Sequence, residues 1–80
     1  MHEIYLAEEI INKVQNEAET KEAEKVTAVR IAIPEDEHYT AEAFEDALKI
    51  QAEGTLAEGA KFYVFPEKTD KPYIKDIRIK

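Results

Sequence analysis

The stretch KVTAVRIAIP, residues 25–34, decides the fold, because its apolar residues recur at every second position. The β-branched residues are Val29, Ile31 and Ile33, and the residues between them are Ala28, Arg30 and Ala32. This period of two predicts a strand whose branched side chains are buried on one face. Pro34 ends the strand, and a short polar segment, EDEHY, follows it.

The residues before this strand, from about Glu3 to Lys21, predict an amphipathic helix. At about 100° per residue, one group of apolar residues falls on a single arc that would face a core. These residues are Ile4, Ala7, Ile10, Ile11, Val14 and Ala18. The opposite side carries charges of alternating sign at every fourth position, Glu9, Lys13, Glu17 and Lys21. Such pairs stabilise a helix only weakly, so we interpret this row as a solvated face.

The residues after the strand, from Ala41 to Glu53, predict a second helix. Thr40 is the expected N-cap, and Gly54 is placed to follow the helix as its C′ residue. The apolar side of this helix consists of Phe44, Ala47, Leu48 and Ala52. The charged side consists of Glu42, Glu45, Asp46, Lys49 and Glu53.

Two further strands are predicted in the last third of the chain. AKFYVF (60–65) is rich in aromatic and β-branched residues and is stopped by Pro66, and PYIKDIRIK (72–80) alternates again. The polar connector EKTDK has the length of a turn, so we expect these two strands to form an antiparallel hairpin. Alternation also places Ile77 and Ile79 on the same side of the last strand as Tyr73 and Lys75.

The order helix, strand, helix, strand, strand predicts the α+β class. A right-handed crossover through the second helix makes the first two strands parallel if they are neighbours. Both helices need an apolar sheet face, so we expect them on one face of a three-stranded mixed sheet, in a single domain over residues 1–80. The other face, with Arg30, Arg78 and Lys80, is expected to be solvated or to bind a partner.

Composition excludes several classes of function. The net charge of −7 in 80 residues argues against nucleic acid, which needs clustered Lys or Arg. The chain has no Cys and no Ser and only two glycines, so common nucleophiles, a zinc site of Cys residues and a glycine-rich phosphate loop are absent. We therefore expect no enzyme. No apolar run is long enough to span a membrane, which makes the cytoplasm the expected compartment.

Several segments together resemble the HypA/HybF family of nickel chaperones for hydrogenase maturation. They are MHE (1–3), LAEEI (6–10), KVTAVRI (25–31), AEAFEDAL (41–48), AEGTLAEGAKF (52–62) and YIKDIRIK (73–80). The resemblance implies delivery of nickel to a [NiFe]-hydrogenase, with His2 as the required nickel ligand and Glu3 as a contributor. It also implies two partners, the hydrogenase-maturation GTPase and the hydrogenase large subunit.

The sequence departs from the family in three places. The family pattern has a zinc domain with paired Cys-x-x-Cys motifs between the last two strands, where this chain has only a turn near residues 66–72. No zinc is therefore expected. Pro34-Glu35 stands where the family has Gly-Glu, and Thr40 replaces an acidic residue. The chain is expected to be either a short natural relative or a fragment from which the zinc domain was removed.

The chemistry of the first three residues suits a square-planar ion. The α-amine and the His2 imidazole have ordinary pKa values of about 8 and about 6.5, so both can be deprotonated at modest cost near neutral pH. With the His2 amide nitrogen between them they close fused chelate rings in one plane, as Ni(II) and Cu(II) prefer. Glu3 supplies a fourth ligand through its amide or carboxylate, or another chain does. The competing interpretation of Met1, His2 and Glu3 is a frayed polar end.

Other candidate residues have simpler explanations. His38, an additional metal-ligand candidate, is expected to be a surface histidine beside Glu35, Asp36 and Glu37. Tyr63, Phe65 and Tyr73 form either a binding patch or cross-strand packing partners. Two alternatives to nickel delivery remain open: a metal-free interaction or regulatory module, and an engineered scaffold that keeps the fold without the zinc domain.

Overall fold

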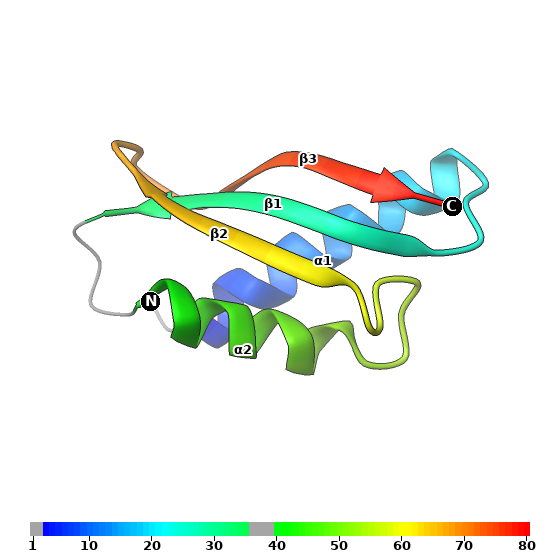
Figure 1. Ribbon diagram of the computed structural model, residues 1–80, viewed down its shortest axis with the longest axis horizontal. Coiled ribbons are helices and arrows are strands. Elements are labelled where there is room, and N and C mark those ends of the chain that lie inside the picture. Colours follow the sequence, from blue (N-terminus) through cyan, green and yellow to red (C-terminus); the bar gives the residue numbers. More distant parts are fainter. Residues whose placement is uncertain (1–2, 36–39) are drawn as a thin grey trace.

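Five elements of secondary structure follow one another along the chain in the predicted order. The computed structural model describes residues 3–35 and 40–80, and of Glu3 the backbone alone. The helices are α1 (Glu3–Thr20) and α2 (Ala41–Ala52), and the strands are β1 (Val26–Pro34), β2 (Lys61–Glu67) and β3 (Tyr73–Ile79). The two helices and the three-stranded mixed sheet confirm the α+β class (Figure 1).

β1 is the central strand of the sheet, whose order is β2-β1-β3. It pairs in parallel with β2, where Ile31 lies opposite Val64, and antiparallel with β3, where Ile31 lies opposite Ile74. The parallel pair confirms the crossover through α2. The expected hairpin of the last two strands is wrong, because β2 and β3 lie on opposite sides of β1 and residues 68–72 cross the end of that strand (Figure 1).

Burial explains the central position of β1. Its core-facing residues Val29, Ile31 and Ile33 are at most 1% exposed, and Ala32 on the opposite sheet face is 0% exposed. A hairpin of β2 and β3 would leave this apolar strand at an edge of the sheet. The connection 68–72 is long enough to prevent that, because it must cross only two strand spacings, or about 10 Å.

Both helices cover the same face of the sheet, as expected (Figure 1). All the predicted core residues of α2 are buried, and so are those of α1 from Ala7 onward. Ile4 was also expected in this core, and that prediction is wrong because its side chain is 57% exposed. Ile4 lies in the first turn of α1, where Tyr5 is also mostly exposed and burial in the core begins only at Ala7.

A bulge in β3 changes which of its residues face the helices. Arg30 lies opposite Asp76 and Ile31 lies opposite Ile74, so Lys75 is the extra residue. As a result Ile74 and Ile77 both pack against the core, although they are three positions apart. The prediction that Ile77 shares a side with Tyr73 and Lys75 is therefore wrong, since regular alternation is interrupted between them.

The ends of α2 follow the predicted cap chemistry. The Thr40 hydroxyl accepts a hydrogen bond from the amide of Ala43 at 3.0 Å. Gly54, after the C-cap residue Glu53, has φ of +80°, a conformation that favours glycine. Pro66 does not stop β2, which continues to Glu67. An edge strand tolerates proline because its outward N–H has no partner to lose.

The charged row of α1 is solvated, as predicted. Glu17 and Lys21 form an ion pair at 3.2 Å, and both side chains are about half exposed. Within residues 3–35 and 40–80, neither helix is long and apolar enough to cross a membrane.

Candidate functional site

The predicted metal ligands lie at and before the start of α1. Met1, His2 and the additional candidate His38 lie outside the described residues, and Glu3 is the first residue of the helix. The structure therefore does not test which of them approach one another. Their assignment stays a prediction, and the described residues near the start of α1 form the surroundings of the predicted site.

Several segments lie together at the end of the molecule where α1 begins. The start of α1, the end of β1, the start of α2 and the connection between β2 and β3 all lie there (Figure 1). The connection and α1 line opposite sides of a small groove of about 60 Å³. The groove is lined by Leu6, Glu9, Ile10 and Lys13 of α1 and by Lys71 and Pro72 of the connection. The segment where the resemblance places a zinc domain thus lies against the helix that follows the predicted nickel ligands.

The helix start leaves backbone nitrogens available for a metal. α1 begins at Glu3, and the first four N–H groups of an α-helix have no carbonyl partner within the helix. Removing the proton from the Glu3 amide therefore breaks no hydrogen bond within α1. The local backbone is compatible with the amide ligand that the predicted chelate requires.

Carboxylates lie near the same end of the molecule, after β1, at the end of β2 and in the connection that follows β2. A shallow pocket of about 350 Å³ is lined by Glu35, Glu67, Lys68, Thr69 and Asp70. Glu67 accepts hydrogen bonds from Lys75 and from the Tyr73 hydroxyl, and these bonds lower the pKa of its carboxyl. In the described part of the chain, no three His, Cys, Asp or Glu side chains are arranged to hold a metal ion.

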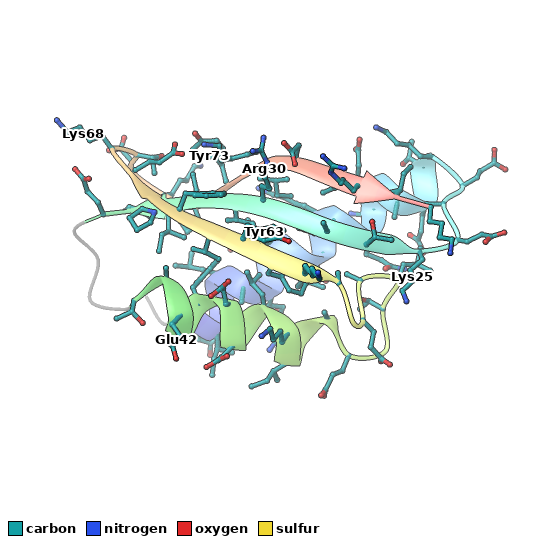
Figure 2. All side chains as sticks on the ribbon, viewed as in Figure 1. Lys25, Arg30, Glu42, Tyr63, Lys68 and Tyr73 are labelled. Carbon is teal, nitrogen blue, oxygen red and sulfur yellow. The ribbon has the colours of Figure 1, made fainter. Side chains whose placement is uncertain are left out.

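The predicted aromatic residues share the sheet face that the helices leave uncovered (Figure 2). Tyr63 lies opposite Arg30, whereas Phe65 and Tyr73 flank Ala32 from the two outer strands. The three rings are 39–45% exposed, so they are cross-strand neighbours that still reach solvent. The Lys75 ammonium lies 5.3 Å from the centre of the Phe65 ring, within the range of a cation–π contact.

An ion pair that sequence reasoning missed lies at the centre of this face. Asp76 accepts bonds from Arg30 Nε, at 2.8 Å, and from Arg30 Nη2. The two residues are 46 positions apart, and only the pairing of β1 with β3 brings them together. Opposite charges on neighbouring strands are the sequence signal that indicates such a pair. The signal did not apply to Arg30 and Asp76, because β3 was expected to pair with β2 and not with β1.

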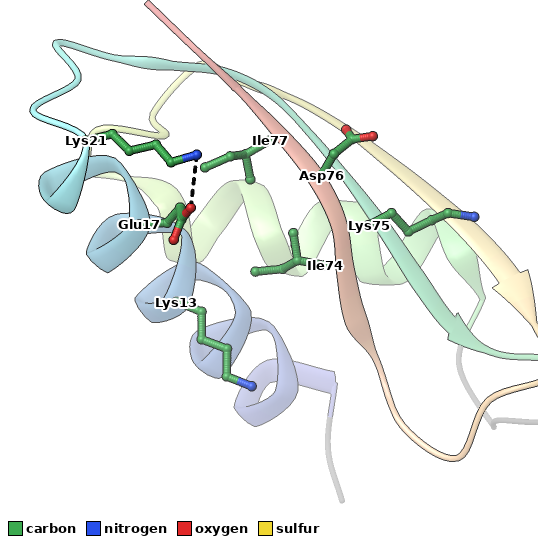
Figure 3. Close-up of a pocket in the computed structure, with 7 residues that line it drawn as sticks. All are labelled: Lys13, Glu17, Lys21, Ile74, Lys75, Asp76 and Ile77. Atoms are coloured by element: carbon green, nitrogen blue, oxygen red, sulfur yellow. Dashed lines mark ion pairs between the residues drawn. The ribbon is translucent and has the colours of Figure 1, made fainter.

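A wider groove of about 410 Å³ separates α1 from β3 (Figure 3). The α1 side carries Lys13, Glu17 and Lys21, and Ile74 and Ile77 are half-buried on the β3 side. Glu17 is paired with Lys21, which extends toward β3 (Figure 3). The groove is open and lacks a convergent set of catalytic groups, so it does not indicate an active site.

Comparison with known proteins gives a consistent result. The family profile described as "Hydrogenase/urease nickel incorporation, metallochaperone, hypA" matches residues 1–70. The hydrogenase maturation factor HypA of Archaeoglobus fulgidus is 39% identical over 70 residues, which cover 88% of this chain and 64% of that protein. HypA of Methanopyrus kandleri is 37% identical over 68 residues, covering 85% of this chain and 48% of that protein. The chain thus spans about half to two thirds of these relatives.

Solved structures agree on the fold. The solution structure of the Ni metallochaperone HypA from Helicobacter pylori superposes with a TM-score of 0.74 at 20% identity, covering all of this chain and 87% of that one. A second HypA solution structure gives a TM-score of 0.71 at 17% identity and covers 92% of that chain. At these identities the likeness shows a shared fold.

Proposed function

The chain belongs to the HypA family, whose profile matches residues 1–70, and on that premise we propose that it binds Ni(II) through Met1, His2 and Glu3. The family description names a metallochaperone, which carries a metal ion to another protein. We propose that this chain acts in the same way and is not an enzyme. Its recipient would be a [NiFe]-hydrogenase, because the relatives are named hydrogenase maturation factors.

One observation supports the terminal site most directly. The family match includes the first three residues, and α1 begins only at Glu3. Among the residues whose burial is described, the first fully buried one is Ala7, so the core begins one turn after the start of α1. The proposed donors, the α-amine, the His2 amide and the imidazole, precede the helix, and the Glu3 amide has no carbonyl partner within it.

The ligand set determines the preferred ion. Three nitrogens in one plane favour a tetragonal ion, and the Glu3 amide or carboxylate completes the square. Cu(II) binds such a site more strongly than Ni(II), so selectivity for nickel depends on which metal the cell makes available. His38 is a further candidate ligand. No structural zinc is expected, since the chain has no Cys.

A metal site at a chain terminus can be approached by a second protein, which allows the ion to be transferred. A ligand group at a chain end can be replaced one donor at a time by the ligands of a second protein. We propose the hydrogenase-maturation GTPase and the hydrogenase large subunit as the two partners, in the cytoplasm. Urease is a second recipient class, because the family description names it beside hydrogenase.

A metal-free interaction module, natural or engineered, is the second candidate function. The observation that favours it is the direct connection of β2 to β3 through residues 68–72, in a chain without Cys. In this case the fold would be kept for binding a partner, and nickel would not be required.

Calorimetric titration separates the two candidates. Ni(II) is added to protein whose intact mass shows a free Met1, and to the variant His2→Ala. We expect one ion per chain in the first case and a loss of at least about 100-fold in affinity in the second, because the variant lacks the imidazole and the chelate ring that it closes. Glu42→Ala, at an exposed position of α2, is the control and should leave the nickel affinity unchanged.

A second change tests the role of the amine itself. Two residues added before Met1 keep the His2 imidazole but remove the terminal amine from the chelate. Binding should weaken and the diamagnetic spectrum of square-planar Ni(II) should disappear. Equal nickel binding by the extended protein, or by His2→Ala, would exclude the terminal site.

A further inference from the structure

The uncovered face of the sheet carries three rows of side chains, and each strand contributes one residue to every row. Residues that lie opposite each other on paired strands point to the same face, so the register of the sheet defines the rows. The first row consists of Lys61, Ala28 and Arg78, the second of Tyr63, Arg30 and Asp76, and the third of Phe65, Ala32 and Tyr73. Neither helix lies on this face, because both cover the other one (Figure 1).

Positive charge is concentrated on this face, although the chain as a whole has a net charge of −7. Among the described residues of the three strands, four basic and two acidic side chains lie on it, which gives a net charge of +2. They are Arg30, Lys61, Lys75 and Arg78, and Glu67 and Asp76. The two helices on the opposite face contain eight acidic and two basic residues. A negatively charged partner is therefore attracted to the sheet face and repelled by the helical face.

Two of the four cations on this face are unpaired. Arg30 and Lys75 are each held by a carboxylate of the same face. Lys61 and Arg78 are exposed, and their side chains form no ion pair or hydrogen bond with the described residues. They flank Ala28, which is half-buried, and their Cα atoms are two strand spacings apart, or about 10 Å. A carboxylate above Ala28 is therefore within reach of both side chains.

The opposite end of the face is aromatic. Phe65 and Tyr73 flank Ala32, which is 0% exposed although neither helix covers it, so the neighbouring side chains must cover it. Both rings remain partly exposed, and so does Tyr63, two positions before Phe65. This end of the face thus offers aromatic surface that an apolar side chain of a partner can cover.

We propose that this face binds an extended acidic segment of a partner protein, with a carboxylate between Lys61 and Arg78 and a large apolar side chain against Phe65 and Tyr73. The two contacts are centred on Ala28 and Ala32, four residues apart on β1, or about 13 Å. An extended segment that runs along β1 covers this distance in four residues as well. The expected pattern in the partner is one or two carboxylates and a large apolar residue four positions away.

Single-stranded nucleic acid fits this face less well. Asp76 and Glu67 place carboxylates among the cations, where they would repel a continuous phosphate backbone. The ring of Phe65 is already contacted by the Lys75 ammonium, which competes with stacking of a base. The acidic helices add long-range repulsion of a polyanion. A short segment with few carboxylates avoids most of this repulsion.

This interaction does not require nickel. The residues that form the face lie on the three strands, and none of them is a proposed nickel ligand. Binding of the acidic segment should therefore be the same in the presence of a metal chelator and in the variant His2→Ala. Failure of this proposal and failure of the nickel site can thus be told apart.

NMR titration of the full chain tests the surface. The probe is an acetylated peptide of Gly and Ser that contains two adjacent Asp residues and a Leu four positions after the second Asp. We expect shifts at the amides of Ala28, Arg30, Lys61 and Tyr63, and a Kd of about 1 mM because the contact is small and exposed. Replacing both Asp residues of the peptide by Asn should weaken binding by about tenfold, and replacing its Leu by Ser by about threefold.

Variants of the protein test the two unpaired cations. Lys61→Gln combined with Arg78→Gln should weaken binding of the peptide by about tenfold. The matched control is Lys13→Gln combined with Lys49→Gln, which makes the same change of net charge at exposed positions of the two helices and should leave the Kd unchanged. Charge reversal, Lys61→Glu with Arg78→Glu, should bind a peptide with Lys in place of both Asp residues more tightly than wild type does.

Several results would overturn the proposal. One is the absence of binding at about 10 mM peptide, and another is equal binding by the Lys61→Gln, Arg78→Gln variant and its control. Shifts confined to the two helices would place the contact elsewhere. Tighter binding of a dT oligonucleotide of the same charge, or the same shifts on adding unlabelled chain in place of the peptide, would identify a different occupant of the face.

Discussion

Arg30 and Asp76 join the central strand to its antiparallel neighbour on the uncovered face of the sheet, with Arg30 Nε 2.8 Å from Asp76 Oδ2. The hydrogen bond and the charge of Arg30 lower the pKa of Asp76. A carboxyl whose pKa is lower in the folded state stabilises the fold above its unfolded pKa, about 4, and loses that contribution as the pH falls through the folded value.

Arg30→Gln should therefore raise the pKa of Asp76 toward its ordinary value. Carboxyl-carbon NMR across the acid range measures that pKa directly. The variant should also be less stable than wild type at pH 7, and the difference should disappear below the folded pKa of Asp76. Lys49→Gln on α2 is the control. An unchanged Asp76 pKa in Arg30→Gln would contradict the role of this pair.

Tyr73 should titrate at higher pH than an ordinary tyrosine. Its hydroxyl donates to Glu67 at 2.9 Å, and this hydrogen bond raises the pKa of Tyr73 because losing the proton removes it. Glu67→Gln removes the charged acceptor and should lower the pKa of Tyr73, as measured by ring NMR at alkaline pH. Glu42→Gln, a carboxylate on α2, should leave that titration as it is in wild type.

Phe44→Ala should be among the most destabilising changes in the chain. The ring is fully buried in the core between the helices and the sheet, and replacing such a side chain by alanine costs about 3–5 kcal/mol. Urea unfolding at pH 7 measures the loss. Ile50→Ala on the same helix removes a side chain that is 64% exposed, so it should change stability by less than about 0.5 kcal/mol.

Thr40→Ala should shorten or loosen the start of α2. The change leaves the Ala43 amide without its acceptor, at a cost of about 1 kcal/mol in the free energy of unfolding. Thr40→Ser keeps a hydroxyl at the same place and should restore most of the loss. If both variants were equally unstable, the hydroxyl would not be the group that stabilises this helix start.

Nickel binding, if it uses the terminal amine and His2, should depend steeply on pH. Below about pH 6.5 the amine, the imidazole and the His2 amide all carry protons in the free protein, so about three protons leave for each ion bound and the affinity falls by about 1000-fold per pH unit. Calorimetry between pH 5.5 and pH 8 measures this slope. A slope of one proton or fewer would indicate a site made from carboxylates instead.

Local features of the fold were predictable from the sequence because each depends on a short stretch of chain. The buried side of α2, with Phe44 and Leu48, follows from a period that no other element alters. The Thr40 cap and the Gly54 turn follow from the chemistry of single residues. The candidate nickel ligands were found from the terminal residues and the family resemblance, since a chelate closed by neighbouring residues requires no knowledge of the fold.

The sequence by itself thus determined the elements, their order and the faces that the two helices bury. The tertiary structure alone decided that β3 pairs with β1, that Lys75 forms a bulge, and that Arg30 meets Asp76. The physical reason is that a strand can form the same backbone hydrogen bonds with either neighbour. The strand that takes the central place is the one whose burial between two neighbours stabilises the fold most. For β1 this burial includes Ala32 on the uncovered face, and it depends on the whole sheet and not on a short stretch of sequence.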